Sequence, residues 1–312
     1  MGGLQADSFT GAMYEHSPFG KVWYVDVTNG SDGNSGEAPD QAYASVGAAI
    51  DAAVATRGDT VIIAPGTYTI TAALAPKAMM TFRAAVVNPQ FPTVSVRGNI
   101  ANLVTVDASG TRWIGLEFRA TGTTNRNLIH VADTSAVNGL TFEDCVFHGA
   151  DQNNNATYPS LAGVCGINVK DATNATTGLV VRRCLFRDLG KTQLNVGVLG
   201  IPYAKIEDNL FAIDSNNGFG ISLANTAAFA TGKGFIIRNN EFTGLDSSAT
   251  ETAISLGGAT EDATGAGIIR TNYFAYLGKS GGAIDTNRLP MAIINNYAGD
   301  TGTGGTLVDV GD

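Results

Sequence analysis

Residues 206–211 read Ile206-Glu-Asp-Asn-Leu-Phe211, and this short pattern recurs along the chain. Aligning the sequence on itself gives six copies in register, with 24 to 39 residues between the starts of successive copies. Such irregular spacing around a constant motif is typical of a β-solenoid, in which the strands stack while the loops differ in length. The copies start at Phe142, Val181, Ile206, Ile237, Ile269 and Ile293.

The first two positions of the repeat predict which side chains face the core and which face water. The first position is apolar in every copy and often β-branched, which indicates an inward side chain on a buried strand. The second position is charged in five copies and alternates in sign over the first four. Neighbours about 4.8 Å apart are therefore predicted to form ion pairs on the outer surface. These charged residues are Glu143, Arg182, Glu207, Arg238 and Arg270.

The fourth and sixth positions predict two structural columns inside the solenoid. The fourth position is Cys or Asn, and an inward Asn at a corner can bond to backbone groups and to its neighbour in the next coil. The sixth position is Phe in five copies, which predicts a stack of rings along the axis. The two columns are Cys145, Cys184, Asn209, Asn240, Asn272 and Asn296, and Phe147, Phe186, Phe211, Phe242 and Phe274.

Short runs with a period of two lie between the copies and predict a second sheet in each coil. These runs are 128–131, 166–169, 220–223, 253–256 and 282–285, and a degenerate earlier coil lies at 102–106 and 113–118. The expected fold is therefore all-β, a single-stranded right-handed parallel β-helix. Its expected size is roughly eight or nine coils and about 40 Å in length.

The first 70 residues depart from the repeat and predict a cap. Residues 45–55 are rich in Ala, with apolar side chains at helical spacing after Ser45, a suitable N-cap residue. A short α-helix here would cover the first coil, whose open end otherwise presents unpaired backbone groups. The expected organisation is an arm at 1–20, the cap and first coil at 21–70, the β-helix at 71–298 and a tail at 299–312.

Two N-terminal segments resemble the opening of the pectate-lyase-like β-helix superfamily. They are Trp23-Tyr-Val-Asp-Val-Thr-Asn-Gly-Ser-Asp-Gly-Asn-Ser-Gly36 and Gly58-Asp-Thr-Val-Ile-Ile-Ala-Pro-Gly-Thr-Tyr-Thr69. The resemblance is close over about the first coil and extends to the other coils by pattern. It implies the fold and leaves the function open, because the superfamily includes secreted polysaccharide lyases and hydrolases, surface adhesins, and bacteriophage tailspike, fibre and decoration proteins.

Charge and hydropathy bear on the possible partners. The net charge is −9 with only 19 Lys and Arg, which argues against a nucleic-acid-binding surface. The sequence shows no secretory signal pattern and no apolar run of membrane-spanning length. We therefore expect neither nucleic acid nor membrane as a partner.

Metal-binding patterns are weak in this sequence. The three cysteines, at 145, 165 and 184, have no metal-site spacing. The oxygen-rich segment Asp26–Gly36 has the composition of a Ca²⁺ loop but lacks its terminal bidentate Glu, so it is interpreted as a turn. No cofactor is expected, and Ca²⁺ is the one cation considered.

The resemblance also implies what a catalytic site in this superfamily contains. Its lyases use a Lys or Arg base beside Ca²⁺ held by Asp clusters, and its hydrolases use Asp pairs near a Gly-His-Gly segment. Neither pattern is present, and the histidines at 16, 130 and 148 stand in unrelated contexts. The remaining candidates for a catalytic carboxylate pair are Glu143, Asp144, Glu207 and Asp208. Their position in the charge ladder favours a structural role.

Two functional hypotheses follow. The leading one is a non-enzymatic structural protein on the surface of a bacteriophage particle, a decoration, fibre or spike protein. Such a protein would contact other virion proteins, form a homo-oligomer, preferably a trimer, and present a surface to host glycan. The alternative is a secreted or tailspike-type enzyme that degrades a polysaccharide, either a lyase or a glycoside hydrolase.

Overall fold

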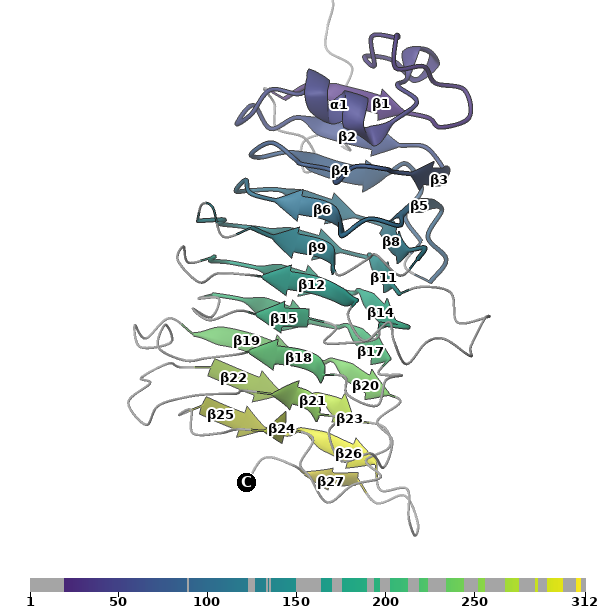
Figure 1. The fold of residues 1–312 in the computed structure, drawn as a ribbon. Coiled ribbons are helices and arrows are strands. Elements are labelled where there is room, and N and C mark those ends of the chain that lie inside the picture. Colours follow the sequence, from purple (N-terminus) through teal and green to yellow (C-terminus); the bar gives the residue numbers. More distant parts are fainter. Residues whose placement is uncertain are drawn as a thin grey trace, which may run out of the picture.

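A computed structural model gives the arrangement of the chain (Figure 1). It describes residues 20–88, 90–122, 127–132, 134, 136–149, 164–169, 176–189, 194–196, 203–212, 219–223, 234–243, 252–255, 267–274, 284–285, 291–299 and 307–309. The expected arm at 1–20 lies outside these residues except for Gly20.

Three sheets run the length of the molecule, and all but one of their strand pairings are parallel. Sheet A contains β1 (Val22–Val25), β2 (Thr60–Ile63), β4 (Thr81–Ala84), β7 (Arg112–Ile114), β10 (Thr141–Glu143), β13 (Val180–Arg182), β16 (Lys205–Glu207), β19 (Phe235–Arg238), β22 (Gly267–Arg270) and β25 (Met291–Ile294). Sheet B contains β3 (Gly66–Thr69), β5 (Val94–Gly98), β8 (Leu116–Ala120), β11 (Val146–His148), β14 (Leu185–Arg187), β17 (Leu210–Ala212), β20 (Glu241–Thr243), β23 (Tyr273–Phe274), β26 (Tyr297–Gly299) and β27 (Leu307–Asp309). Sheet C contains β6 (Asn102–Val106), β9 (Asn127–Val131), β12 (Cys165–Val169), β15 (Leu194–Val196), β18 (Phe219–Leu223), β21 (Thr252–Ser255) and β24 (Ile284–Asp285).

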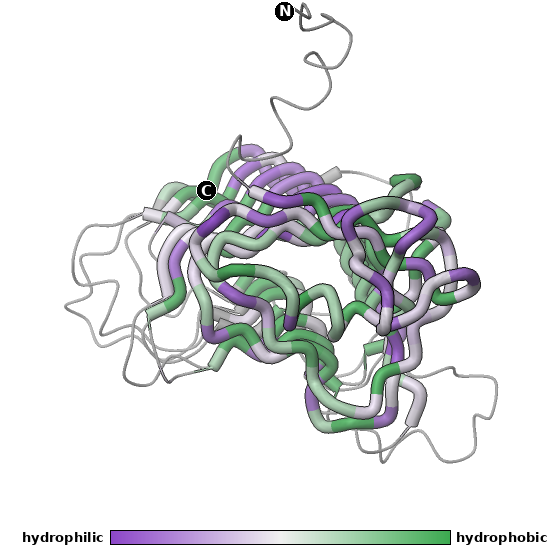
Figure 2. Tube along the Cα trace, turned by 90° about the horizontal axis from the view of Figure 1, so that it is seen from above, coloured by the Kyte–Doolittle hydropathy of each residue, from purple (hydrophilic) through white to green (hydrophobic). Residues whose placement is uncertain are grey.

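This arrangement confirms the right-handed parallel β-helix. Seen along the axis, the coils superimpose around one core (Figure 2). The expectation of two sheets per coil was wrong, because the hexapeptide does not form one strand. Its first two residues end a strand of sheet A and its last two lie in sheet B, so the period-two runs make a third sheet. The size was also underestimated, since sheet A holds ten strands.

A single residue in the left-handed conformation turns the chain from sheet A to sheet B in each of seven successive coils. It occupies the third position of the repeat, and its φ lies between 51° and 71°. One of the seven is glycine and the others have side chains that must accept this conformation. The seven are Gly115, Asp144, Arg183, Asp208, Asn239, Thr271 and Asn295.

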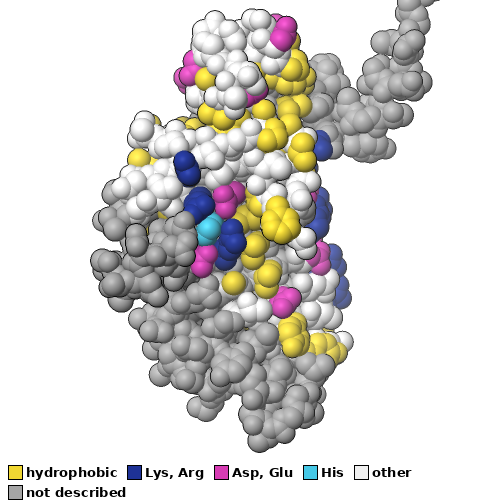
Figure 3. All heavy atoms as spheres, turned by 90° about the vertical axis from the view of Figure 1, so that its right-hand side faces the viewer, with side chains coloured by type: hydrophobic (Ala, Val, Ile, Leu, Met, Phe, Trp, Pro, Cys, Tyr) yellow, Lys and Arg dark blue, Asp and Glu magenta, His cyan; other side chains and the backbone are white. Residues whose placement is uncertain are grey.

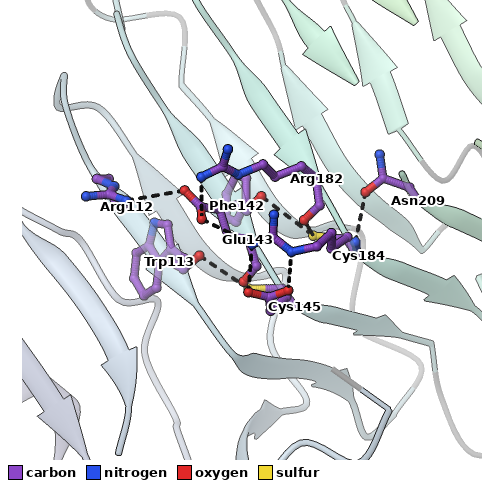
Figure 4. A network of polar contacts seen from close by, with 10 residues as sticks. Arg112, Trp113, Phe142, Glu143, Cys145, Arg182, Cys184 and Asn209 are labelled. Carbon is purple, nitrogen blue, oxygen red and sulfur yellow. Dashed lines mark hydrogen bonds and ion pairs between the residues drawn. The ribbon is translucent and has the colours of Figure 1, made fainter. Parts of the chain in front are cut away.

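The next residue at this corner forms the inner Cys/Asn column. Each Asn donates from Nδ2 to a sheet A carbonyl of the preceding coil, as Asn209 does to Val181 at 2.9 Å. Each Asn Oδ1 accepts from the backbone N–H one coil earlier, so Asn209 receives the N–H of Cys184 at 2.9 Å (Figure 4). Cys145 contacts the Trp113 carbonyl in the same way through Sγ, at 3.4 Å. The column therefore satisfies buried backbone groups that the turn leaves outside the sheets.

The phenylalanine column packs at the centre of the core. Phe118 precedes the five predicted residues, and all six rings are fully buried. Successive rings from Phe147 to Phe274 stack at centroid distances of 4.5 to 5.1 Å. Because each coil repeats the same ring, the core of one coil continues into the next.

The N-terminal end is covered by α1 (Val46–Ala52), as expected, with a short 3-10 helix, η2 (Pro39–Gln41), before it. The Ser45 hydroxyl accepts the Ala48 N–H at 3.2 Å and caps α1. Apolar side chains of α1 are buried against the strands of the first coils. The helix is thus held over the open edge of the core (Figure 1).

The expected C-terminal tail contributes one strand to sheet B. This strand, β27, pairs antiparallel with β26, with Val308 opposite Ala298. This pairing covers the outer edge of sheet B, whereas the outermost strands of the other two sheets are β25 and β24.

Candidate functional site

The outer face of sheet B carries two columns of side chains, on either side of the inward Phe column. Strand alternation places residues before and after each Phe outside. The residue after the Phe position forms the column Arg97, Arg119, His148 and Arg187, from consecutive coils in register. The residue before it contributes Ser95 and Glu117. Charged and imidazole groups therefore gather midway along this face (Figure 3).

His148 lies at the centre of this cluster, between two carboxylates. Its Nδ1 is 3.2 Å from Glu117 Oε1, and its Nε2 is 2.9 Å from Asp188 Oδ2. The imidazole and Glu117 are largely buried, whereas the Asp188 side chain is 27% exposed. Asp188 is thus the carboxylate of the pair that a ligand can reach.

Arginines border the imidazole in register on both sides. Arg187 Nη2 is 3.4 Å from His148 Nδ1 and 3.7 Å from Glu117 Oε1, and its side chain is 42% exposed. Arg119 is paired with His148 in the neighbouring strand. The site therefore offers cationic groups to solvent beside an acid–base cluster.

The carboxylates stabilise the charged form of the imidazole. Burial opposes that charge, but hydrogen bonds to Asp188 and Glu117 outweigh it and raise the pKa of His148. Burial likewise opposes ionisation of Glu117, yet hydrogen bonds from His148 and Ser95 lower the pKa of that carboxyl. An imidazolium donating to two carboxylates is the arrangement these shifts favour.

A close backbone approach places Asp188 beside His148. Gly149 N–H donates to the Arg187 carbonyl at 3.1 Å, and a Cβ at Gly149 would lie 1.6 Å from the Asp188 carbonyl oxygen. Asp188 itself is in the left-handed conformation, with a φ of 54°. Only glycine leaves room for this turn, so the sequence His148-Gly149 is part of the site.

The four carboxylates considered from the sequence lie elsewhere, on sheet A and at the adjoining corner. Glu143 is ion-paired with Arg112 at 3.3 Å and with Arg182 at 2.8 Å (Figure 4). Asp144 pairs with Arg183 at 2.7 Å. Glu207 pairs with Arg238 at 2.6 Å, and Asp208 accepts from Asn239 at 3.2 Å. The structure does not bring these four residues to His148.

The oxygen-rich N-terminal turn uses its carboxylates internally. Asp26 Oδ1 accepts the N–H groups of Thr28 and Asn29, and Asp32 Oδ1 accepts that of Ser45. Among the described residues, no group of three or more His, Cys, Asp or Glu side chains is placed to hold a metal ion. The described residues also contain no helix that is long and apolar enough to span a membrane.

A second polar column follows one register position of sheet C. Its members whose side chains the structure describes are Thr105, His130, Asn168 and Ser222. This column has no arginine or lysine, whereas the sheet B cluster combines carboxylates, an imidazole and cations. The sheet B cluster is therefore the stronger candidate for a catalytic site.

Sequence reasoning missed this site because its residues come from three coils. The aligned Phe column contains the signal that was needed. Reading one residue past Phe118, Phe147 and Phe186 gives Arg119, His148 and Arg187, which is an unusual concentration of polar groups on adjacent strands. The histidine that stood in no recognisable context is therefore contacted by two carboxylates.

No protein-family model matches the chain, and no curated protein matches it either. Solved structures share the fold. The pectin methylesterase from Aspergillus niger aligns with a TM-score of 0.54 at 13% identity, over 92% of this chain and 88% of the other. A PL6-family alginate lyase, AlyGC, aligns with a TM-score of 0.55 at 13% identity, over 89% of this chain but 37% of the lyase. The A-module of the Azotobacter vinelandii mannuronan C-5 epimerase AlgE4 aligns with a TM-score of 0.50 at 16% identity, over 80% of this chain and 71% of the module.

These neighbours are polysaccharide-processing enzymes. At such low identity the likeness establishes the fold alone. The virion hypothesis, with its virion partners, trimer and particle-surface location, is not tested by these comparisons and stays a prediction.

Proposed function

We propose that this protein is a polysaccharide lyase that acts on an acidic glycan at the outer face of sheet B. The observation that carries the proposal is the position of His148, bonded between Glu117 and Asp188 and bordered by arginines of adjacent coils. The polysaccharide-processing activities named for the structural neighbours support the substrate class.

The cluster suits elimination better than a two-carboxylate glycosidase. In a glycosidase, the sugar lies between the two carboxyl groups. Here the imidazole ring fills the space between Glu117 and Asp188, because each ring nitrogen faces one of them. The carboxylates therefore cannot flank a glycosidic bond.

The residues present can complete an elimination cycle. Asp188, ionised and accessible, takes the proton from the carbon next to the sugar carboxylate. The C–O bond to the leaving sugar breaks, a C=C bond forms, and the carboxyl of Asp188 passes the proton it has taken to the leaving oxygen, which regenerates the carboxylate. His148 holds that carboxylate in place through their 2.9 Å bond. Arg187 and Arg119 bind the sugar carboxylate and offset its charge.

The test measures formation of the unsaturated product by its ultraviolet absorbance, with pectin, polygalacturonate and alginate as substrates. His148→Gln and Asp188→Asn should each abolish product formation, while Arg187→Gln should raise KM more than it lowers kcat. Glu207→Gln, in the sheet A ladder, should retain activity. Absence of cleavage by the unaltered protein, or full activity of both His148→Gln and Asp188→Asn, would contradict the proposal.

A further inference from the structure

The outward register column that contains Glu117 continues along sheet B to the C-terminal end, from the buried Val146 to the exposed Tyr273 and Tyr297. Each step is a register pair between adjacent strands. The column reads Glu117, Val146, Leu185, Leu210, Glu241, Tyr273 and Tyr297. Beyond the charged cluster it is thus apolar, then acidic, then aromatic, and hydrophobic side chains continue down this face in Figure 3.

The two tyrosines at the end of this column are exposed. Tyr273 and Tyr297 lie in register on adjacent strands, and each is 40% exposed. The inward Phe274, next to Tyr273 in β23, is fully buried and stacks on Phe242 of the preceding coil. Over the described part of the chain, neither tyrosine ring contacts another ring. Ring surface is therefore available to a ligand at this end of sheet B.

We infer that Tyr273 and Tyr297 form a subsite that stacks a neutral sugar unit of the same glycan chain that is bound at His148. This inference rests on the proposed function, because it takes the acidic part of the glycan to be bound at His148. An aromatic ring offers a broad apolar face with a polar rim, which suits the C–H face and the hydroxyls of a pyranose.

Charge selects the type of sugar at this subsite. Glu241 is exposed and is paired in register with Tyr273, and its carboxylate can accept hydrogen bonds from sugar hydroxyls but repels a carboxylate. The arginines lie at the other end of the strip, beside His148. A glycan with acidic units at the cluster and a neutral unit at the tyrosines matches both ends.

Strand spacing sets the length of glycan required. Four strand steps separate β11, which carries His148, from β23, which carries Tyr273. At about 4.8 Å per step this is roughly 19 Å along the axis, a span of several sugar units. Short oligosaccharides bound at His148 therefore do not reach the tyrosines, whereas polymers do.

Affinity electrophoresis tests the subsite, with pectin, which mixes acidic units and neutral esterified units, and with fully de-esterified polygalacturonate as probes. The unaltered protein should be retarded more by pectin, and Tyr273→Ala with Tyr297→Ala should weaken pectin binding about tenfold. Tyr273→Phe with Tyr297→Phe, which keeps the rings, should retain binding. Circular dichroism of each variant checks the fold.

The outcomes separate the subsite from the proposed function. Unchanged pectin binding by the Ala variant overturns the subsite, even if His148→Gln is inactive. Ring-dependent binding without any cleavage by the unaltered protein supports the subsite and contradicts the lyase. Equal retardation by both probes, or none, overturns the neutral-sugar assignment. Loss of a dimer in the Ala variant, measured by sedimentation, overturns the subsite in favour of a second copy of this chain.

Discussion

Asn272 Oδ1 accepts two hydrogen bonds from Asn240, one from its backbone N–H and one from its side-chain amide, both at 3.0 Å. Asn240 donates its amide to the Ile206 carbonyl as well, at 2.9 Å. Both asparagines are buried. Each coil therefore depends on the next to satisfy its corner, which makes this column sensitive to a single substitution.

Asn240→Leu should lower the free energy of unfolding by about 1 to 3 kcal/mol, because it leaves buried backbone and amide groups without partners. Urea denaturation measures the change. Arg270→Gln, on the exposed surface of the adjacent strand, is the matched control and should change stability by less than about 0.5 kcal/mol. An Asn240→Leu protein as stable as the unaltered one would contradict a buried role for the column.

Phe211→Ala should lower the free energy of unfolding further, by about 3 to 5 kcal/mol, because it opens a cavity between two stacked rings. Phe211 lies 4.7 Å from Phe186 and 4.9 Å from Phe242, measured between ring centroids. The same urea experiment gives the value. Equal effects of Phe211→Ala and the surface variant Arg270→Gln would show that the assigned inward register is wrong.

The interior of the solenoid was the part that the sequence could predict. Positions such as Asn240 and Phe211 face the same environment in every coil, so the same residue type recurs and can be recognised without a structure. The number of sheets was not predictable in this way. The chain turns at single residues such as Asp144 and Arg183, whose types do not distinguish a left-handed turn from a strand.

The site was harder to predict, because the outward positions of sheet B do not repeat one residue type from coil to coil. Glu117 and His148 occupy register positions where other coils have Leu, Ala or Thr, and Asp188 directly follows β14. Only the pairing of β8, β11 and β14 brings them together. A repeat that identifies core residues therefore does not identify the outward residues that form the candidate site.

The stability of the protein should depend on pH through this cluster. The raised pKa of His148 means that its contribution is complete below the unfolded value of about 6.5 and is lost as pH rises through the folded pKa. The lowered pKa of Glu117 means that its contribution is present above about 4.3 and is lost as pH falls through the folded pKa. We expect a maximum in the unfolding free energy between these values.

Urea denaturation at a series of pH values measures this dependence, and His148→Gln is the control. The variant should lack the loss of stability above about pH 6.5 that the unaltered protein shows. If both proteins lost the same unfolding free energy above about pH 6.5, groups other than His148 would cause that loss.

The strand β27 should protect the end of sheet B. Its pairing with β26 covers backbone groups that would otherwise form an open edge. Removing residues 300–312 should therefore increase aggregation, measured by light scattering against protein concentration. Removing only 310–312, which keeps β27, is the control and should leave the protein as soluble as the full chain. Equal solubility of both truncated proteins would show that the edge is tolerated.

Gly149→Ala should move the Asp188 carboxylate away from His148 without removing the carboxyl group. The added Cβ would lie 1.6 Å from the Asp188 carbonyl oxygen, so the turn must move and carry the carboxylate away from His148 Nε2. The pKa of His148 should then fall, because the hydrogen bond to Asp188 is the largest of the effects that raise it. Titration of the imidazole by NMR measures the shift, with Asp188→Asn as the comparison. A His148 pKa that falls in Asp188→Asn but not in Gly149→Ala would show that the carboxylate reaches the imidazole without the close backbone contact.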